Sequence, residues 1–212
     1  MRDQATELRN LVLRSQRASA TPGGLRLLAF ASGQRDAGAT DLVRKFASQC
    51  AEQGLRVVLV DEAQFPTGLA GVHWLEQLRK REQHADAVFI DAGAGPSELL
   101  QACWHLADEI VLTTTPDSAA IMETYALIKA FHAVTLGPLI QLVVRGAAST
   151  EVASDVHRRI DQSCQRFLQQ RIELLGSVPS DSPQTASELS PAVAALAALI
   201  AKPARAAGLQ VA

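Results

Sequence analysis

The chain has 212 residues, which suits one domain with a short extension. Hydrophobic residues make up 48% of it and charged residues 20%, a balance that excludes a disordered chain. No apolar run approaches the roughly 20 residues that cross a bilayer, and a net charge of -2 argues against a nucleic-acid binder. The polar N-terminus and three widely spaced cysteines predict a cytoplasmic protein with reduced, buried thiols at Cys50, Cys103 and Cys164.

The first twenty residues predict a helix separate from the rest of the chain. Ala5, Leu8, Leu11 and Val12 have the spacing of one helical face, and arginines outnumber acidic residues in this segment. The sequence around Pro22 then ends the helix and is typical of a flexible linker. We therefore expect an N-terminal helical arm over 1–20, a linker over 21–24 and one α/β domain over 25–212.

Beyond the linker, short apolar runs alternate with amphipathic segments. In chain order we expect a strand at 25–31, a helix at 40–53, a strand at 56–61, a helix at 72–83, a strand at 87–91, a helix at 97–106, a strand at 109–114, a helix at 118–131, a strand at 139–144, a helix at 153–170, a strand at 172–176 and a helix at 190–200. This alternation predicts a doubly wound, mostly parallel sheet with helices on both faces. Ligands of such sheets bind beyond the carboxyl ends of the strands, here at 32–40, 61–66, 91–95 and 113–117.

The loop after the first strand has the position of a phosphate-binding loop. It reads Ser-Gly-Gln-Arg-Asp-Ala-Gly-Ala-Thr over 32–40. This segment resembles the S-G-K-G-G-V-G-K-T loop of the MinD/ParA group of deviant-Walker ATPases, which have a P-loop NTPase fold of the SIMIBI type. The matching residues are Gly33, Gly38 and Thr40, while Gln34 and Ala39 stand where that group has lysines.

The departures from that pattern remove positive charge from the expected phosphate site. Ala39 cannot donate a charge-assisted hydrogen bond, and Asp36, at a glycine position of the pattern, would repel phosphates. We therefore expect a degenerate P-loop that binds no cofactor, a pseudo-ATPase, and no ATP-driven homodimer.

Two acidic residues end the second and third predicted strands. Asp61 and Asp91 resemble the water-positioning and Mg²⁺-associated aspartates of the same group, so that Thr40 and Asp91 would hold Mg²⁺ if ATP binds. Acids at strand ends also commonly cap loops and helices, and both interpretations remain open. Arg145 stands where the group usually has an asparagine that contacts adenine.

The arm resembles the N-terminal D-Q-A-x-x-L-R segment of FlhG, a MinD-like family that regulates flagellar number and placement. That resemblance implies an activator helix that docks on FlhF, a GTPase of the signal-recognition-particle type. Gln4 would complete the partner's GTPase site, because a glutamine amide can orient the attacking water. The residues implied in contact with the partner are Asp3, Ala5, Leu8, Arg9, Leu11 and Val12. A helix that packs on its own domain, or that is solvated, is the alternative.

The C-terminal segment over 191–212 is rich in alanine and has only Lys202 and Arg205 as cations, so we expect no membrane anchor there. The sequence thus predicts a nucleotide-independent FlhG-like regulator that binds and stimulates FlhF. One alternative is a working ATPase with an atypical loop that uses Thr40, Asp61 and Asp91. Another is a MinD-like scaffold in a different cell-positioning system.

Overall fold

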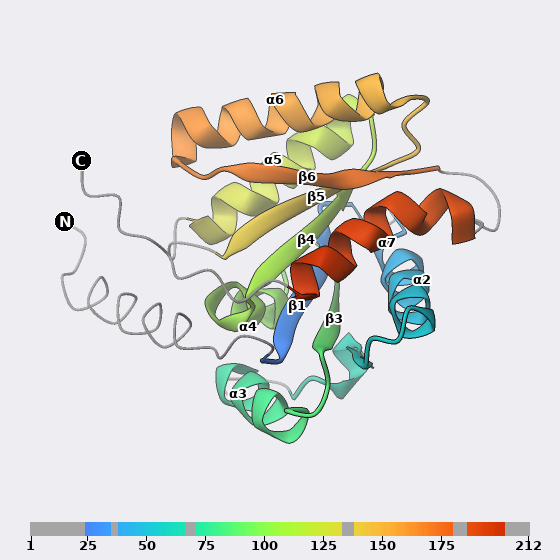
Figure 1. Cartoon of the computed structure of the whole chain (residues 1–212). Coiled ribbons are helices and arrows are strands. Elements are labelled where there is room, and N and C mark those ends of the chain that lie inside the picture. The colour runs from blue at the N-terminus through green and yellow to red at the C-terminus, as the bar shows by residue number, and fades with distance from the viewer. Residues whose placement is uncertain (1–23, 35–37, 67–70, 133–137, 180–185, 202–212) are drawn as a thin grey trace, which may run out of the picture.

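The structure is a computed structural model that describes residues 24–34, 38–66, 71–132, 138–179 and 186–201 (Figure 1). The predicted arm, most of the linker and Asp36 lie outside these described residues. Within them, six strands form one parallel sheet in the order β2-β3-β1-β4-β5-β6. The strands are β1 (Arg26–Ser32), β2 (Val57–Val60), β3 (Ala87–Ala94), β4 (Glu109–Thr114), β5 (Leu139–Arg145) and β6 (Ile172–Val178).

Helices cover both faces of the sheet, as the sequence predicts (Figure 1). They are α2 (Ala39–Glu52), α3 (Gly71–Arg81), α4 (Glu98–Leu106), α5 (Ser118–His132), α6 (Thr150–Leu168) and α7 (Ala186–Ala201). Because crossovers between parallel strands are right-handed, the direction in which the chain moves along the sheet determines which face each connecting helix covers. The chain moves from β1 toward the β2 edge first, and every later crossover moves toward the β6 edge. Consequently α2 packs on one face and α3 to α6 pack on the other, while α7, which follows the last strand, packs on the α2 face.

The core is built mainly from aliphatic side chains with a few aromatic anchors. On the α2 face Phe30 packs against Phe89 and Phe46, with ring centroids 4.9 and 6.3 Å apart. On the other face Trp104 stacks on Phe131 at 5.2 Å. Apolar side chains are buried on both faces of β1 and β4, which explains why these strands are nearly continuous apolar runs in the sequence.

Every strand and helix predicted within the described residues is present, with shifted ends. β3 continues past Asp91 through a bulge at Gly93, where φ is 70°. β6 continues to Val178, because Leu175 bulges out of register and Gly176 remains in the strand instead of ending it. α7 begins four residues before the predicted Ser190 and runs through Pro191, and the short 3-10 helix η1 (Glu62–Gln64) was not expected.

The three cysteines are free and buried, as predicted. Burial raises the pKa of Cys50 to about 11 and the pKa of Cys103 and Cys164 to about 12, so none of these thiols is a ready nucleophile. Among the helices that the structure describes, none is both long enough and apolar enough to span a membrane.

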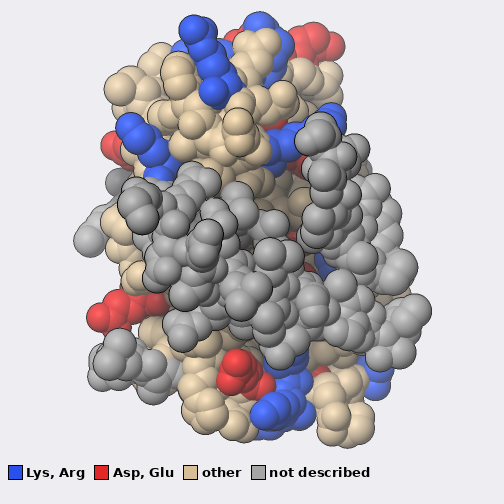
Figure 2. All heavy atoms as spheres, turned by 90° about the vertical axis from the view of Figure 1, so that its left-hand side faces the viewer, with Lys and Arg blue, Asp and Glu red and all other residues tan. Residues whose placement is uncertain are grey.

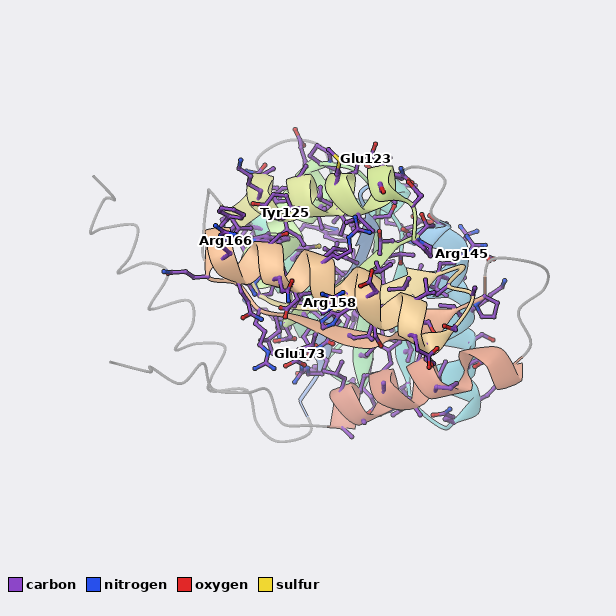
Figure 3. The ribbon with its side chains drawn as sticks, turned by 90° about the horizontal axis from the view of Figure 1, so that it is seen from above. Glu123, Tyr125, Arg145, Arg158, Arg166 and Glu173 are labelled. Atoms are coloured by element: carbon purple, nitrogen blue, oxygen red, sulfur yellow. The ribbon has the colours of Figure 1, made fainter. Side chains whose placement is uncertain are left out.

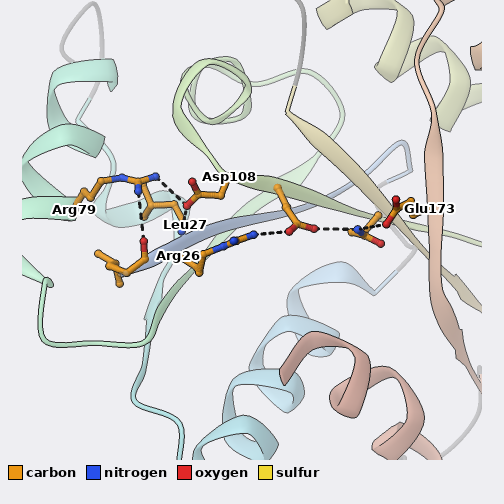
Figure 4. A network of polar contacts seen from close by, with 8 residues as sticks. Arg26, Leu27, Arg79, Asp108 and Glu173 are labelled. Atoms are coloured by element: carbon orange, nitrogen blue, oxygen red, sulfur yellow. Dashed lines mark hydrogen bonds and ion pairs between the residues drawn. The ribbon is translucent and has the colours of Figure 1, made fainter. Parts of the chain in front are cut away.

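Two polar networks hold the amino ends of the strands (Figure 4). In the first, Asp108 accepts a hydrogen bond from the backbone N–H of Leu27 at 2.7 Å and is paired with Arg79 of α3 at 3.0 Å. In the second, Arg26 donates to Glu109 at 2.6 Å. Gln141 then donates from its amide nitrogen to Glu109 at 3.0 Å and to Glu173 at 3.1 Å. The second network therefore links β1, β4, β5 and β6 across the α7 face.

Glu109 is the most deeply buried charge of this network, with no exposed surface. Burial raises its pKa from 4.5 to about 7, although Arg26 and the Gln141 hydrogen bond act in the opposite direction. Because the folded state holds this proton more tightly than the unfolded state, the contribution of Glu109 to stability is full below pH 4.5. It is lost as the pH rises through about 7.

We predict that Glu109→Gln flattens the pH dependence of the free energy of unfolding. Between pH 5 and 8 the wild-type protein should lose roughly 2–3 kcal/mol relative to the variant, because the buried carboxylate ionises. Urea unfolding at half-unit pH intervals measures this difference. Glu52→Gln, which removes an exposed carboxylate of α2, is the matched control. Parallel profiles for wild type and Glu109→Gln would contradict the assignment.

Candidate functional site

Strand geometry gathers the candidate residues on the α2 face of the sheet, at its carboxyl edge. Phe30, Leu59, Phe89, Val111 and Val143 all pack in the core under α2 and α7. Side chains two positions further along a strand point to the same face. That face of the carboxyl edge therefore receives Ser32, Asp61, Asp91, Thr113 and Arg145.

The loop between β1 and α2 is held at both ends. Ser32 donates from its hydroxyl to the carbonyl of Gln34 at 2.5 Å. A Cβ added at Gly33 would lie 2.8 Å from the backbone of Glu123 and Thr124, so only glycine lets the loop pass this close to the middle of α5. At the other end Gly38 has a φ of 67° and precedes the first residue of α2, Ala39.

The start of α2 presents backbone N–H groups without a side-chain cap. The N-cap residue is Gly38, which has no side chain, and no side chain of the described residues caps the first N–H groups of α2. The methyl group of Ala39 is buried, and Thr40 is exposed. The N-terminus of α2 therefore carries the partial positive charge of an uncapped helix, but no lysine follows the loop.

Arg145 brings a cation to this loop from β5. A Cβ added at Gly38 would lie 1.5 Å from Nη1 of Arg145 and 2.6 Å from its Cζ. The guanidinium therefore packs directly on the α-carbon of Gly38, and any side chain at that position would displace it. Figure 3 shows Arg145 at the end of β5, in front of the α2 side of the molecule.

Asp91 is tied into the neighbouring loop. It is 6% exposed, and its carboxylate accepts a hydrogen bond from the backbone N–H of Gly93 at 3.1 Å. Gly95 donates from its N–H to the carbonyl of Ser32 at 2.8 Å, which fastens this loop to the end of β1. Asp91 thus has the loop-capping role that the sequence left open, and one of its carboxylate oxygens makes that contact.

Asp61 differs from Asp91 in its surroundings. It precedes η1 in the N-cap position but makes no capping hydrogen bond with its side chain. Its Oδ1 atom is buried and has no hydrogen-bond partner among the described residues. A carboxylate oxygen in that condition is costly unless a ligand or water satisfies it. Capping therefore does not account for Asp61.

Most of the 113–117 segment is structural. Thr114 bonds the hydroxyl of Thr124 at 3.1 Å, and Asp117 caps α5 by accepting from the N–H of Ala120 at 2.9 Å. The hydroxyl of Thr115 donates to Asp117 and, with this cap, holds the pKa of Asp117 below its usual value. The exception is Thr113, whose hydroxyl is buried and has no hydrogen-bond partner in the described part of the chain.

The structure thus assembles part of the predicted site. Gly33, Gln34, Gly38, Ala39 and Thr40 line one loop, with Asp61 and Asp91 at the ends of adjacent strands. Within the described ranges no group of three acidic, histidine or cysteine side chains is arranged to hold a metal ion. The contact of Arg145 with Gly38 was not predicted, because 107 positions separate the two residues and only the register of β5 brings them together. A cation directly after a buried strand was the available signal.

Comparisons with known proteins bear on the fold. No family model matches the sequence, and no curated protein matches it. Among solved structures, the cell division ATPase MinD of Pyrococcus furiosus superposes with a TM-score of 0.60 at 15% identity, over 82% of this chain and 99% of that one.

Two further structures give the same result. A ParA family ATPase from Chlorobium tepidum has a TM-score of 0.54 at 14% identity, covering 82% of this chain and 91% of that one. The septum site-determining protein MinD of Pyrococcus horikoshii, complexed with Mg-ADP, has a TM-score of 0.52 at 14% identity and covers 85% and 87%. The chain therefore has the P-loop NTPase fold of the MinD and ParA ATPases.

Proposed function

We propose that this protein is an FlhG-like regulator that works without a nucleotide switch and stimulates an SRP-type flagellar GTPase, FlhF, through its N-terminal segment. The observation that carries the first half is the contact of the Arg145 guanidinium with Gly38, in a loop whose helix begins with Ala39. The second half rests on the sequence of residues 3–9, which lie outside the described residues.

The two absent lysines and the space taken by Arg145 both oppose nucleotide binding in this loop. A triphosphate needs the backbone N–H groups at the start of α2 to be accessible, together with fixed positive charge from lysine. The Arg145 guanidinium lies directly on Gly38, where the backbone would have to face the phosphates. Each missing charge-assisted hydrogen bond removes about 1.5–3 kcal/mol, and both lysine positions of the resembled pattern, Gln34 and Ala39, lack the charge.

The arm supplies the proposed activity toward the partner. A glutamine amide positions water and stabilises charge in GTP hydrolysis, and Gln4 has that chemistry. Leu8, Leu11 and Val12 offer an apolar helical face, and Asp3, Ala5 and Arg9 complete the FlhG-like segment. The partner would be the enzyme, and this chain its cytoplasmic activator.

A working ATPase with an atypical loop is the second candidate, and one observation favours it. The unpartnered Oδ1 of Asp61, which follows the strand paired with that of Asp91, is a position where Mg²⁺-bound water could be held. Under that hypothesis Thr40 and Asp91 hold Mg²⁺, and Arg145 replaces the absent lysine. A MinD-like scaffold in another positioning system, with an incidental arm, is the third candidate.

We predict that Mg-ATP does not change the oligomeric state of the purified protein. Gln34 and Ala39 replace the two lysines that would bind nucleotide across and within subunits. Sedimentation velocity with and without saturating Mg-ATP measures the state. A shift toward dimer on adding Mg-ATP would favour the ATPase hypothesis.

Ala39→Lys alone should not produce ATPase activity. The new lysine restores one interaction, while the guanidinium of Arg145 still covers Gly38 and Gln34 still lacks a charge. A phosphate-release assay on this variant, beside wild type and Ala39→Met as a control of similar length, gives the answer. Turnover more than about tenfold above background, equivalent to roughly 1.4 kcal/mol, would show that the loop backbone is competent.

A synthetic peptide of residues 1–20 should stimulate GTP hydrolysis by the cognate FlhF, and Gln4→Ala should abolish most of that effect. Loss of one transition-state contact typically lowers the rate about 10²-fold or more. Leu8→Asp should instead weaken binding, because it buries a charge against an apolar groove. Single-turnover hydrolysis at saturating peptide, beside a binding titration, separates the two effects. Undiminished stimulation by the Gln4→Ala peptide would reduce the arm to an anchor.

A further inference from the structure

A cavity lies at the amino ends of the strands, at the opposite edge of the sheet from the loop site. It has a volume of about 300 Å³ and lies between α7 and the amino ends of β1, β4, β5 and β6. Its polar floor is the network of Arg26, Glu109 and Gln141, all at most 5% exposed. Ligand cavities typically measure about 300–1,000 Å³, so this one suits a few side chains better than a large cofactor.

The polar groups in the floor of this cavity are paired with one another, whereas the groups at its mouth are exposed. In the floor, both carboxylate oxygens of Glu109 already accept hydrogen bonds, from Arg26 and from Gln141. At the mouth, Leu139 is 41% exposed, and Glu173 is exposed and pairs with no cation of the described residues. The mouth therefore offers an apolar contact beside an unpaired negative charge, a combination that suits an amphipathic, basic segment.

The chain itself supplies such a segment next to the cavity. The described residues begin at Gly24, two positions before Arg26 of the cavity floor, and 23 residues precede Gly24. This segment carries four arginines against Asp3 and Glu7. Tethering a segment so close to its site gives an effective concentration in the millimolar range. Figure 2 faces this side of the molecule, and toward the top and bottom of the view lysine and arginine groups lie among aspartate and glutamate groups.

We propose that residues 1–23 dock on this cavity of their own domain, with Leu8 and Leu11 at its apolar mouth and an arginine of the segment beside Glu173. Gln4, Leu8 and Leu11 follow the i, i+4, i+7 spacing of one helical face. The docked face therefore includes Gln4, and the segment cannot contact its own domain and a partner GTPase through this face at once. The docking is independent of the proposed function; only its inhibitory consequence rests on it.

Hydrogen exchange of the full-length protein tests the docking. Ala198 is an exposed residue of α7 that lines the cavity, and Ala198→Trp should fill the mouth without disturbing the core. Ala194, which is exposed on the same helix and does not line the cavity, provides the control Ala194→Trp. We expect amides of residues 5–15 to exchange about tenfold more slowly in wild type and Ala194→Trp than in Ala198→Trp, which corresponds to a docked population of about nine in ten.

A charge variant gives an independent measurement. Glu173→Lys should accelerate exchange of the same amides about threefold or more, because it places a cation beside the basic segment. Glu52→Lys, at an exposed glutamate of α2, should leave exchange unchanged. Equal exchange of the segment in all of these proteins, whether fast or slow, would overturn the proposal. So would protection that grows with protein concentration, which would assign the cavity to a second copy.

A stimulation assay separates this proposal from the proposed function. If both hold, Ala198→Trp reaches half-maximal stimulation of FlhF at a concentration up to about tenfold lower than wild type, because more of the segment is available. Exchange that responds to Ala198→Trp without stimulation of FlhF by any variant would support docking and contradict the FlhF proposal. Stimulation with exchange unchanged would support the FlhF proposal and contradict docking.

Discussion

Alternate side chains of a β-strand point to the same face of the sheet, and the polar sites at both ends of the strands depend on this constraint. Positions 26, 28, 30 and 32 of β1 face α2 and α7, as do 109, 111 and 113 of β4 and 141, 143 and 145 of β5. The middle positions of each set are apolar and form the core under the two helices. The outer positions are polar at both the amino and the carboxyl ends of the strands. One face of the sheet therefore carries two separate polar sites with an apolar layer between them. Figure 3 shows Arg145 and Glu173 toward opposite ends of this arrangement.

The buried polar groups at the amino and carboxyl ends of the strands differ in their hydrogen bonding. At the amino edge the Arg26–Glu109 pair is 2.6 Å long, and Gln141 donates to the other carboxylate oxygen, so both oxygens of the buried Glu109 carboxylate accept hydrogen bonds and the pair helps to fix the strands. At the carboxyl edge the hydroxyl of Thr113 and one oxygen of Asp61 have no partner in the described part of the chain. A carboxylate with both oxygens paired, such as Glu109, holds structure, whereas the unsatisfied oxygens of Asp61 and Thr113 mark places where a ligand or water belongs. By that criterion the carboxyl edge keeps the character of a binding site even though its loop lacks lysine.

The strands and helices were predicted well because they follow from the local pattern of apolar and polar residues. Short apolar runs and amphipathic segments gave the strands and helices within a few residues, because burial on one or both faces decides these elements. Two of the errors in strand length occurred at glycines: Gly93 lies at a bulge inside β3, and Gly176 remains paired in β6 after the bulge at Leu175. The loop site was located by topology, since strand ends converge at one edge. The contacts within the loop site were not predicted. The approach of Arg145 to Gly38 depends on strand register and on a side-chain rotamer, and the spacing of residues in the sequence determines neither.

A cation that belongs to the protein cannot switch in the way that a bound nucleotide does. A nucleotide changes the state of a loop because it binds and leaves, and each event alters the local charge by several units. The Arg145 guanidinium, which lies against Gly38, is covalently attached and so cannot bind and leave in this way. If the loop is constant, regulation of the arm has to come from an equilibrium elsewhere in the chain. Competition between two docking sites for the face of Gln4, Leu8 and Leu11 is such an equilibrium, and it needs a difference of only about 1.4 kcal/mol to change the available fraction tenfold.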